Sequence, residues 1–343
     1  MNHPDLDSSP SLIRRAALLA ALLQGLGIHS AGAATGQPHA FTLAYLPKQV
    51  NNPYHMILGE GVQEAVGELG GQGRMVGPTN AQALAQGPFI QQLITERLNA
   101  VILAANDTVA LLPKVRELRA VGTKIVAVDA DLATDARDLF INQADQEGVG
   151  RAQMQLMHRL MDGRGEFAIL SATPNATNQN AWIYWMLQEL RRPDYKNMKL
   201  TKVVYGNDDA EKSRAQCIAL THSYPNLRGI ICPTTVGILA SAEYLASSPL
   251  KGKVHVTGLG TPNQMRPFIM NGTVKAFQLW SPVDLGYLAT YAAASLIRGQ
   301  ILGKKGDSFA AGRLGDYVVG AKGEVILGAP TTFDISNIDR FHF

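Results

Sequence analysis

Short aliphatic runs alternate with stretches of helical length along almost the whole chain, and this alternation constrains the fold more than any other feature. In the first half the runs cover residues 41–46, 74–77, 100–105, 124–129 and 139–142, with helices expected near 53–69, 82–98 and 108–121. A second series covers residues 166–172, 199–206, 229–233, 254–260 and 274–280. Such alternation is typical of parallel sheets covered by helices. The sequence therefore predicts an α/β protein with two open, mostly parallel sheets.

The length of the chain agrees with two lobes. At 343 residues it exceeds the roughly 100 to 200 residues of an ordinary domain. After the second series there remain one helix over residues 282–299 and two tail strands over 315–320 and 323–327. These are too few for a third domain, and we expect them to return to the two earlier lobes.

The first forty residues differ from the rest. Arg14 and Arg15 precede an apolar run that ends in the small residues Ala31, Gly32 and Ala33. This pattern predicts a signal peptide over residues 1–33, cleaved near Ala33, and places the mature protein outside the cytoplasm. The run is shorter than the ~20 residues that span a bilayer. The paired arginines leave both general and twin-arginine export open.

Charge and motifs exclude several classes of function. The 31 basic residues nearly balance 28 acidic ones and form no basic helix face, so we expect no nucleic-acid partner. No dinucleotide, P-loop, hydrolase or zinc-protease motif is present, and the histidines lack ligand spacing. We therefore expect no cofactor, no metal and no enzyme activity. Asp129 and Asp131 are the one obvious carboxylate pair, but residues two apart do not flank a scissile bond.

The chain has two cysteines, Cys217 and Cys232. An oxidising compartment allows them to pair, but their sequence positions do not fix the distance between them. We expect two unpaired, partly buried thiols, and the disulfide stays an alternative.

Polar residues follow nearly every predicted strand. In open α/β sheets ligands bind beyond the carboxyl ends of the strands, so these residues are candidates for a binding site. Asn and Asp are also common turn residues, which leaves a purely structural role open for Asp131, Asn142 and Trp182 among others. The candidate ligand-binding residues are Lys48, Asn52, Tyr54, Asn106, Asp107, Asp129, Asp131, Asn142, Asn178, Gln179, Trp182, Pro233, Thr235, Gly260 and Trp280.

The chemistry of these groups suits a neutral polyol. Sugar hydroxyls donate and accept hydrogen bonds, which Asp, Lys, Asn and Gln side chains match. Tyr54 and Trp280 offer aromatic faces for a sugar ring. Asp129 ends an aliphatic strand, where a carboxylate without a partner is costly. Lys48 is the only cation at a strand end, and we expect the two to pair.

Several of these segments carry a family resemblance. YLPKQVNNPYH, NATNQNAW and GLGTPNQMR resemble the periplasmic rhamnose-binding proteins of ABC importers, which belong to the ribose-type, two-lobe binding proteins. The resemblance runs from about residue 41 to the C-terminus. It implies a sugar ligand, rhamnose first, an ABC permease as membrane partner, and a monomer.

A related family, the receptors for the autoinducer-2 signal, is the main alternative. The positions that match its ligand-reading residues are Lys48, Asp129, Asn178 with Gln179, Pro233 and Thr235. Asn178 and Thr235 depart from its pattern, which has an aspartate and an alanine there. The resemblance therefore favours a monosaccharide over the signal, although a signalling role and a secreted sugar-acting enzyme stay open.

The resemblance also implies how the chain is divided. Residues 38–143 plus 281–312 would form the N-terminal lobe, and residues 144–280 plus 313–343 the C-terminal lobe. Three crossovers, near residues 142–144, 280–282 and 308–318, would form a three-strand hinge on which the lobes close over the ligand.

Overall fold

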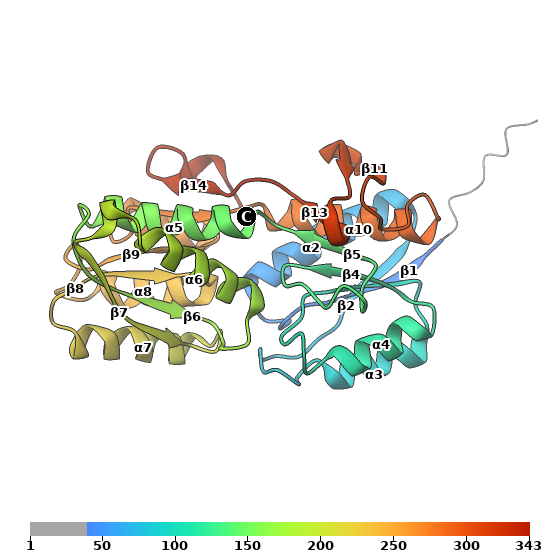
Figure 1. The fold of residues 1–343 in the computed structure, drawn as a ribbon, viewed down its shortest axis with the longest axis horizontal. Helices are drawn as coiled ribbons and strands as arrows, with labels where there is room; N and C mark the ends of the chain where they lie inside the picture. The colour runs from blue at the N-terminus through green and yellow to red at the C-terminus, as the bar shows by residue number, and fades with distance from the viewer. Residues whose placement is uncertain (1–39) are drawn as a thin grey trace, which may run out of the picture. The chain divides into compact units, whose positions relative to one another are not determined.

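The computed structural model describes residues 40–343 (Figure 1). The predicted signal peptide, residues 1–33, and its cleavage site lie outside the described residues. None of the helices in residues 40–343 is long and apolar enough to cross a membrane.

The first lobe is built on a six-stranded parallel sheet in the order β13-β5-β4-β3-β1-β2. Its strands are β1 (Thr42–Leu46), β2 (Gln72–Met75), β3 (Ala100–Leu103), β4 (Lys124–Val128), β5 (Leu139–Asn142) and β13 (Glu324–Ile326). Strands β3 and β5 are buried along their whole length, as expected for a parallel sheet covered on both faces.

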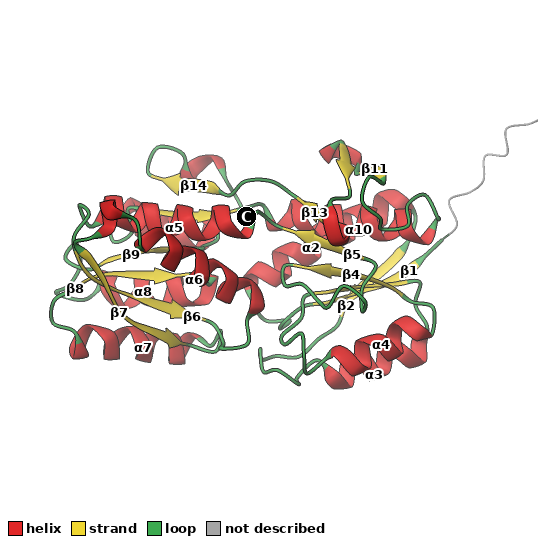
Figure 2. Cartoon of the chain, in the orientation of Figure 1, coloured by secondary structure: helices red, strands yellow, loops and turns green. Residues whose placement is uncertain are grey.

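Four helices cover this sheet (Figure 2). They are α2 (Pro53–Leu69), α3 (Gly87–Glu96), α4 (Leu112–Ala120) and α10 (Pro282–Ile297). Alternate side chains of β1 enter different cores, because successive residues of a strand point to opposite faces. Leu43 and Tyr45 join the core under α2 and α10, while Ala44 and Leu46 join the core under α3 and α4.

The second lobe repeats this plan. Its parallel sheet has the order β7-β6-β8-β9, and β10 pairs antiparallel with β14 beside it. The strands are β6 (Gly165–Ser171), β7 (Met198–Tyr205), β8 (Leu227–Cys232), β9 (His255–Gly258), β10 (Ala276–Leu279) and β14 (Thr331–Asp334). The helices are α5 (Gln146–Leu160), α6 (Thr177–Leu190), α7 (Ala210–Ser223), α8 (Thr235–Ala246) and α9 (Pro262–Met270). The predicted two-sheet α/β architecture is confirmed.

Three segments connect the lobes: one between β5 and α5, one between β10 and α10, and one between β13 and β14. The strand pairing corrects the expected third boundary. The family resemblance implies that residues 313–326 belong to the second lobe. In the structure β13 adds to the first sheet instead, by pairing with β5. The Asn142 side chain also donates to Glu324 Oε1 at 2.7 Å across this pair. The third crossover therefore lies between Ile326 and Thr331.

The two cysteines are free and fully buried. Burial raises the pKa of the Cys217 thiol to about 11 and raises the pKa of Cys232 as well. Both thiols are protonated at neutral pH and lie in the core of the second lobe, Cys232 against the Ser241 hydroxyl at 3.6 Å. The thiols are unpaired, as expected, but they are fully rather than partly buried.

Helices α2 and α10 approach each other closely at two glycines. A Cβ on Gly61 would lie 1.9 Å from the Val283 carbonyl oxygen, and one on Gly286 would lie 2.1 Å from the Leu58 carbonyl oxygen. Both obstacles are backbone atoms, which cannot rotate away. This contact fixes α10 on the first lobe immediately after the second crossover.

We predict that Gly61→Ala lowers the free energy of unfolding by about 1–3 kcal/mol or more, because the methyl group forces the two helices apart. Gly67, on the same helix, faces open space. Gly67→Ala should therefore raise stability by about 0.5–1 kcal/mol through helix propensity alone. Denaturant unfolding of both variants measures the difference. Equal effects would show that the close contact between α2 and α10 is not a constraint.

Candidate functional site

The turns that follow the strands of both sheets enclose a cavity of about 40 Å³. It is lined by Lys48, Asn52, Tyr54, His55, Asp129, Asn178, Gln179, Trp182, Asp208, Pro233, Thr234, Thr235, Leu259, Leu279 and Trp280. An outer cleft of about 620 Å³ shares Asn52, Asp208 and Thr235 with it. The inner cavity has room for about three water molecules, at about 10–15 Å³ each. A sugar ring must therefore displace side chains that now meet across the cavity.

A buried ion pair forms the centre of the site. Lys48 follows β1 and Asp129 follows β4, and Lys48 Nζ lies 2.9 Å from Asp129 Oδ2. Their side chains are 7% and 5% exposed, so each charge depends on the other for compensation. Asp129 has a left-handed backbone with φ of 62° at the sharp turn after its strand. The pairing predicted from the sequence is confirmed.

One side chain of the second lobe forms hydrogen bonds with both members of this ion pair. Asn178, in the first turn of α6, accepts from Lys48 Nζ at 3.3 Å and donates to Asp129 Oδ2 at 3.2 Å. Nearby, Gln49 Nε2 of the first lobe donates to the Asp208 carbonyl oxygen at 3.2 Å. The Asn178 amide thus occupies positions in which a ligand hydroxyl would both donate and accept.

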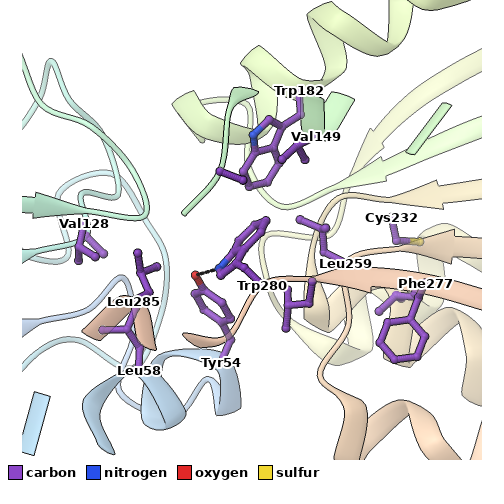
Figure 3. Close-up of a cluster of buried hydrophobic side chains, with 14 of the residues drawn as sticks. Tyr54, Leu58, Val128, Val149, Trp182, Cys232, Leu259, Phe277, Trp280 and Leu285 are labelled. Atoms are coloured by element: carbon purple, nitrogen blue, oxygen red, sulfur yellow. Dashed lines mark hydrogen bonds between the residues drawn. The ribbon is translucent and has the colours of Figure 1, made fainter. Parts of the chain in front are cut away.

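Three aromatic residues form one wall of the cavity (Figure 3). Trp280 packs between Tyr54 and Trp182, with ring centroids 6.3 and 5.7 Å away. Its indole nitrogen donates to the Tyr54 hydroxyl at 2.9 Å, and this hydroxyl donates to Asp129 Oδ1 at 3.2 Å. Burial and the charge of Asp129 raise the pKa of Tyr54 well above its ordinary value, so Tyr54 keeps the proton that it donates.

Trp182 differs from Trp280 in its hydrogen bonding. It is 2% exposed, and its indole nitrogen has no hydrogen-bond partner within residues 40–343. A buried donor without a partner is unfavourable. Trp182 therefore lines the cavity while carrying a buried donor without a partner.

Ten of the fifteen predicted residues line the inner cavity. They are Lys48, Asn52, Tyr54, Asp129, Asn178, Gln179, Trp182, Pro233, Thr235 and Trp280. They come from the turns and helix starts that follow β1, β4, β6, β8 and β10, which the fold brings to one place. Gln179 is held by the Ser171 hydroxyl and the Ala172 amide, both of which donate to its Oε1, at 2.6 and 2.8 Å.

The other five do not line the cavity, which corrects the prediction for them. Asn106 donates to the carbonyl of Lys48 at 3.1 Å and so supports the turn after β1. Asp107 accepts from the amides of Val109 and Ala110, both at 2.8 Å, and caps a turn.

The remaining three have structural partners. Asp131 forms an ion pair with Arg137, and Asn142 bonds Glu324 between β5 and β13. A Cβ on Gly260 would meet Met265 at 2.6 Å, so that glycine allows close packing.

Sequence reasoning missed five lining residues: His55, Asp208, Thr234, Leu259 and Leu279. Leu259 and Leu279 belong to aliphatic runs and give no polar signal. His55 lies one residue beyond a predicted site residue, on the first turn of α2, and Asp208 follows β7 as other site residues follow their strands. Position at a strand end was therefore a signal for Asp208. No group of three or more potential metal ligands occurs in residues 40–343.

His55 is a buried titratable group of the cavity lining. It is 2% exposed, and its Nδ1 lies 2.8 Å from the Tyr45 hydroxyl. Burial lowers its pKa from 6.5 to about 4, although the charge of Asp129 acts in the opposite direction. The imidazole is therefore neutral at neutral pH.

We predict that this histidine contributes to acid sensitivity. Between pH 6.5 and about 4 the unfolded chain protonates His55 while the folded protein does not. The free energy of unfolding should fall through this window as the pH falls, by up to roughly 3 kcal/mol from this group. In thermal melts across this pH window, the stability of His55→Gln should fall less than that of the parent protein. The stability of the exposed control His222→Gln should fall as much as that of the parent. Parallel pH profiles for all three proteins would contradict the prediction.

Comparisons with known proteins add to this geometry. The family model described as a periplasmic binding protein domain matches residues 43–301. The structure of a sugar ABC transporter from Actinomyces odontolyticus is 43% identical, covering 88% of this chain and 98% of that one with a TM-score of 0.71. An ABC transporter solute binding protein from Clostridium phytofermentas with bound L-rhamnose is 35% identical, with 88% and 98% covered and a TM-score of 0.85. LsrB from Clostridium saccharobutylicum in complex with AI-2 shares the fold, at 20% identity, 88% and 100% coverage and a TM-score of 0.83.

Proposed function

Since this chain belongs to the periplasmic binding protein family, we propose that it is the sugar-binding component of an ABC importer, and that its sugar is L-rhamnose or a close deoxysugar. The observation that carries the proposal is the cavity between the lobes, where Lys48 and Asp129 of one lobe meet Asn178 of the other. The 43% identical relative, named a sugar ABC transporter, supports the general class.

Binding would proceed through opening and closing of the lobes. The bonds of Asn178 to Lys48 and Asp129 join the lobes around the cavity. A sugar that bridges the same groups stabilises the closed form through contacts that the open form lacks. The three crossovers allow this movement without disturbing either sheet.

The lining favours a neutral, partly apolar ligand. Sugar hydroxyl groups match these side chains, because Lys48 donates, Asp129 accepts and Asn178 does both. The methyl group of a 6-deoxysugar matches the apolar side chains of Leu259, Leu279 and Trp280, which also line the cavity. Burying one methyl group contributes about 1 kcal/mol. The 35% identical relative with bound L-rhamnose supports this choice.

The autoinducer-2 signal is the second candidate ligand. The fold of LsrB supports it only at the level of architecture. Asn178 and Thr235 stand where the resemblance to that family implies an aspartate and an alanine. Asn178 carries no charge, and its amide both donates and accepts, which suits a sugar hydroxyl. Tight binding of the signal and no binding of sugars would reverse our choice.

We predict that isothermal titration calorimetry detects binding of L-rhamnose, and that Asp129→Asn weakens it by about 100-fold or more. The substitution leaves Lys48 as a buried charge without its partner, and the single asparagine oxygen cannot accept from both Tyr54 and Lys48 as the two carboxylate oxygens do. The matched control is Asp107→Asn, another strand-end aspartate, whose capping role an asparagine also performs. A thermal melt of each variant shows whether it is folded. No heat with any monosaccharide would refute the proposal.

The remaining parts of the proposal concern the cellular setting. We propose export to the periplasm with cleavage near Ala33, a monomer in solution, and delivery of the sugar to an ABC permease. We propose no catalysis, because the chain's relatives are named as binding and transport proteins. Recovery of the sugar chemically unchanged after long incubation tests this point.

A further inference from the structure

Asp208 occupies an unusual backbone position between β7 and α7. Asn207 and Asp208 both have left-handed backbones, with φ of 57° and 48°. Consecutive non-glycine residues in this region are strained, and such strain persists where the surrounding structure enforces it, often at ligand sites. Asp208 lines both the inner cavity and the outer cleft. The turn therefore holds its side chain at the boundary between them.

The turn is fixed from both lobes. Before it, Gly206 allows α7 to approach, because a Cβ there would lie 2.1 Å from Ser213 Oγ. From the other lobe, Gln49 Nε2 donates to the Asp208 carbonyl at 3.2 Å, and Gln49 is itself 5% exposed. The Thr234 hydroxyl donates to Asp208 Oδ1. Oδ2 has no such partner among the hydrogen bonds of residues 40–343.

The charge of Asp208 is also uncompensated. Lys48 is paired with Asp129 at 2.9 Å, and no lysine or arginine of the described chain lies within salt-bridge distance of Asp208. Burial raises the pKa of Asp208, and the nearby charge of Asp129 adds to this, while Thr234 and Lys48 act in the opposite direction. A carboxylate in such surroundings is unfavourable unless hydrogen-bond donors reach it.

We propose that Asp208 is a specificity-determining residue of the sugar site, whose free carboxylate oxygen accepts a hydrogen bond from one ring hydroxyl on the side of the ring that faces the outer cleft. This inference rests on the proposed sugar-binding function. A carboxylate only accepts hydrogen bonds, so Asp208 requires a hydroxyl at that position and disfavours sugars that carry a carboxylate there. The bond from Gln49 forms between the lobes, so closure and recognition of this hydroxyl occur together.

The test combines one variant with a series of analogues. Asp208→Asn keeps the shape of the side chain, and asparagine tolerates the left-handed backbone. We expect it to weaken L-rhamnose binding by about 10- to 100-fold, the effect of losing a hydrogen bond to a charged group. For one of the 1-, 2-, 3- and 4-deoxy forms of L-rhamnose, calorimetry should show that Asp208→Asn weakens binding by less than about 3-fold, because that analogue lacks the hydroxyl that Asp208 reads.

Asp209→Asn is the matched control. Asp209 borders the same outer cleft but not the inner cavity, and it caps α7 by accepting from the Lys212 amide at 2.8 Å. Asparagine is an equally good cap. The control removes the same charge one residue away, and L-rhamnose affinity should stay within about 3-fold of the parent.

Stability provides a second readout. Asp208→Asn removes a carboxylate that has no cation, so the unliganded variant should melt no lower than the parent protein. A residue that merely holds the turn would show the opposite, a lower melting temperature.

The outcomes separate this inference from the proposed function. If the parent protein binds no sugar, the proposed function fails and the role of Asp208 fails with it. If the parent binds L-rhamnose and Asp208→Asn binds it equally well, only the role of Asp208 is overturned. An equal loss for L-rhamnose and all four deoxy forms also overturns it, because Asp208 would then read no individual hydroxyl.

Discussion

The buried ion pair between Lys48 and Asp129 is the interaction on which the arrangement of the site depends. Two charges removed from water are stable only with good geometry and with hydrogen bonds to their remaining donors and acceptors. Tyr54 and Asn178 provide these bonds to Asp129, at 3.2 Å each. Tyr54 in turn is held by Trp280. The need to compensate one pair thus orients groups from both lobes and from the second crossover.

The first lobe holds this pair rigidly because α2 and α10 begin at the site. Asn52 caps α2 by accepting from the Tyr54 amide at 2.9 Å, and Ser281 caps α10 by accepting from the Asp284 amide at 3.1 Å. The glycine contacts between the two helices fix these starts relative to each other. Tyr54 and Trp280 can therefore meet at hydrogen-bonding distance, although 226 residues separate them in the sequence.

The sequence predicts the two sheets well, because aliphatic runs and helical periods are local signals. Its limits are clear at the strand ends. Asn106, Asp107 and Asn178 are all polar residues beyond strands, yet only Asn178 lines the cavity. Asn106 and Asp107 bond to backbone groups near them in the fold, and local sequence gives a cap and a ligand-binding residue the same appearance.

Strand β13 illustrates a second limit. It has three residues and its partner β5 lies some 180 positions earlier, so its lobe depends on a long-range pairing that no local pattern reveals. His55 shows a third limit. Its burial comes from Tyr45 and Tyr54, which pack around it once β1 and α2 are in place. Composition and spacing give no sign of that surrounding.

The contacts between the lobes also set the conditions for selective closure. Asn178 makes three bonds across the site without any ligand, one from Lys48 and two to Asp129, so a ligand gains only the difference between its own bonds and those it replaces. Only such differential affinity shifts a population from open to closed. A ring that merely reproduces the three Asn178 bonds would gain little. A further gain requires groups that have no protein partner in residues 40–343. The indole nitrogen of Trp182 is buried and without a partner, and Oδ2 of Asp208 accepts no hydrogen bond from these residues. Under the proposed function, selectivity therefore draws on contacts beyond the central ion pair.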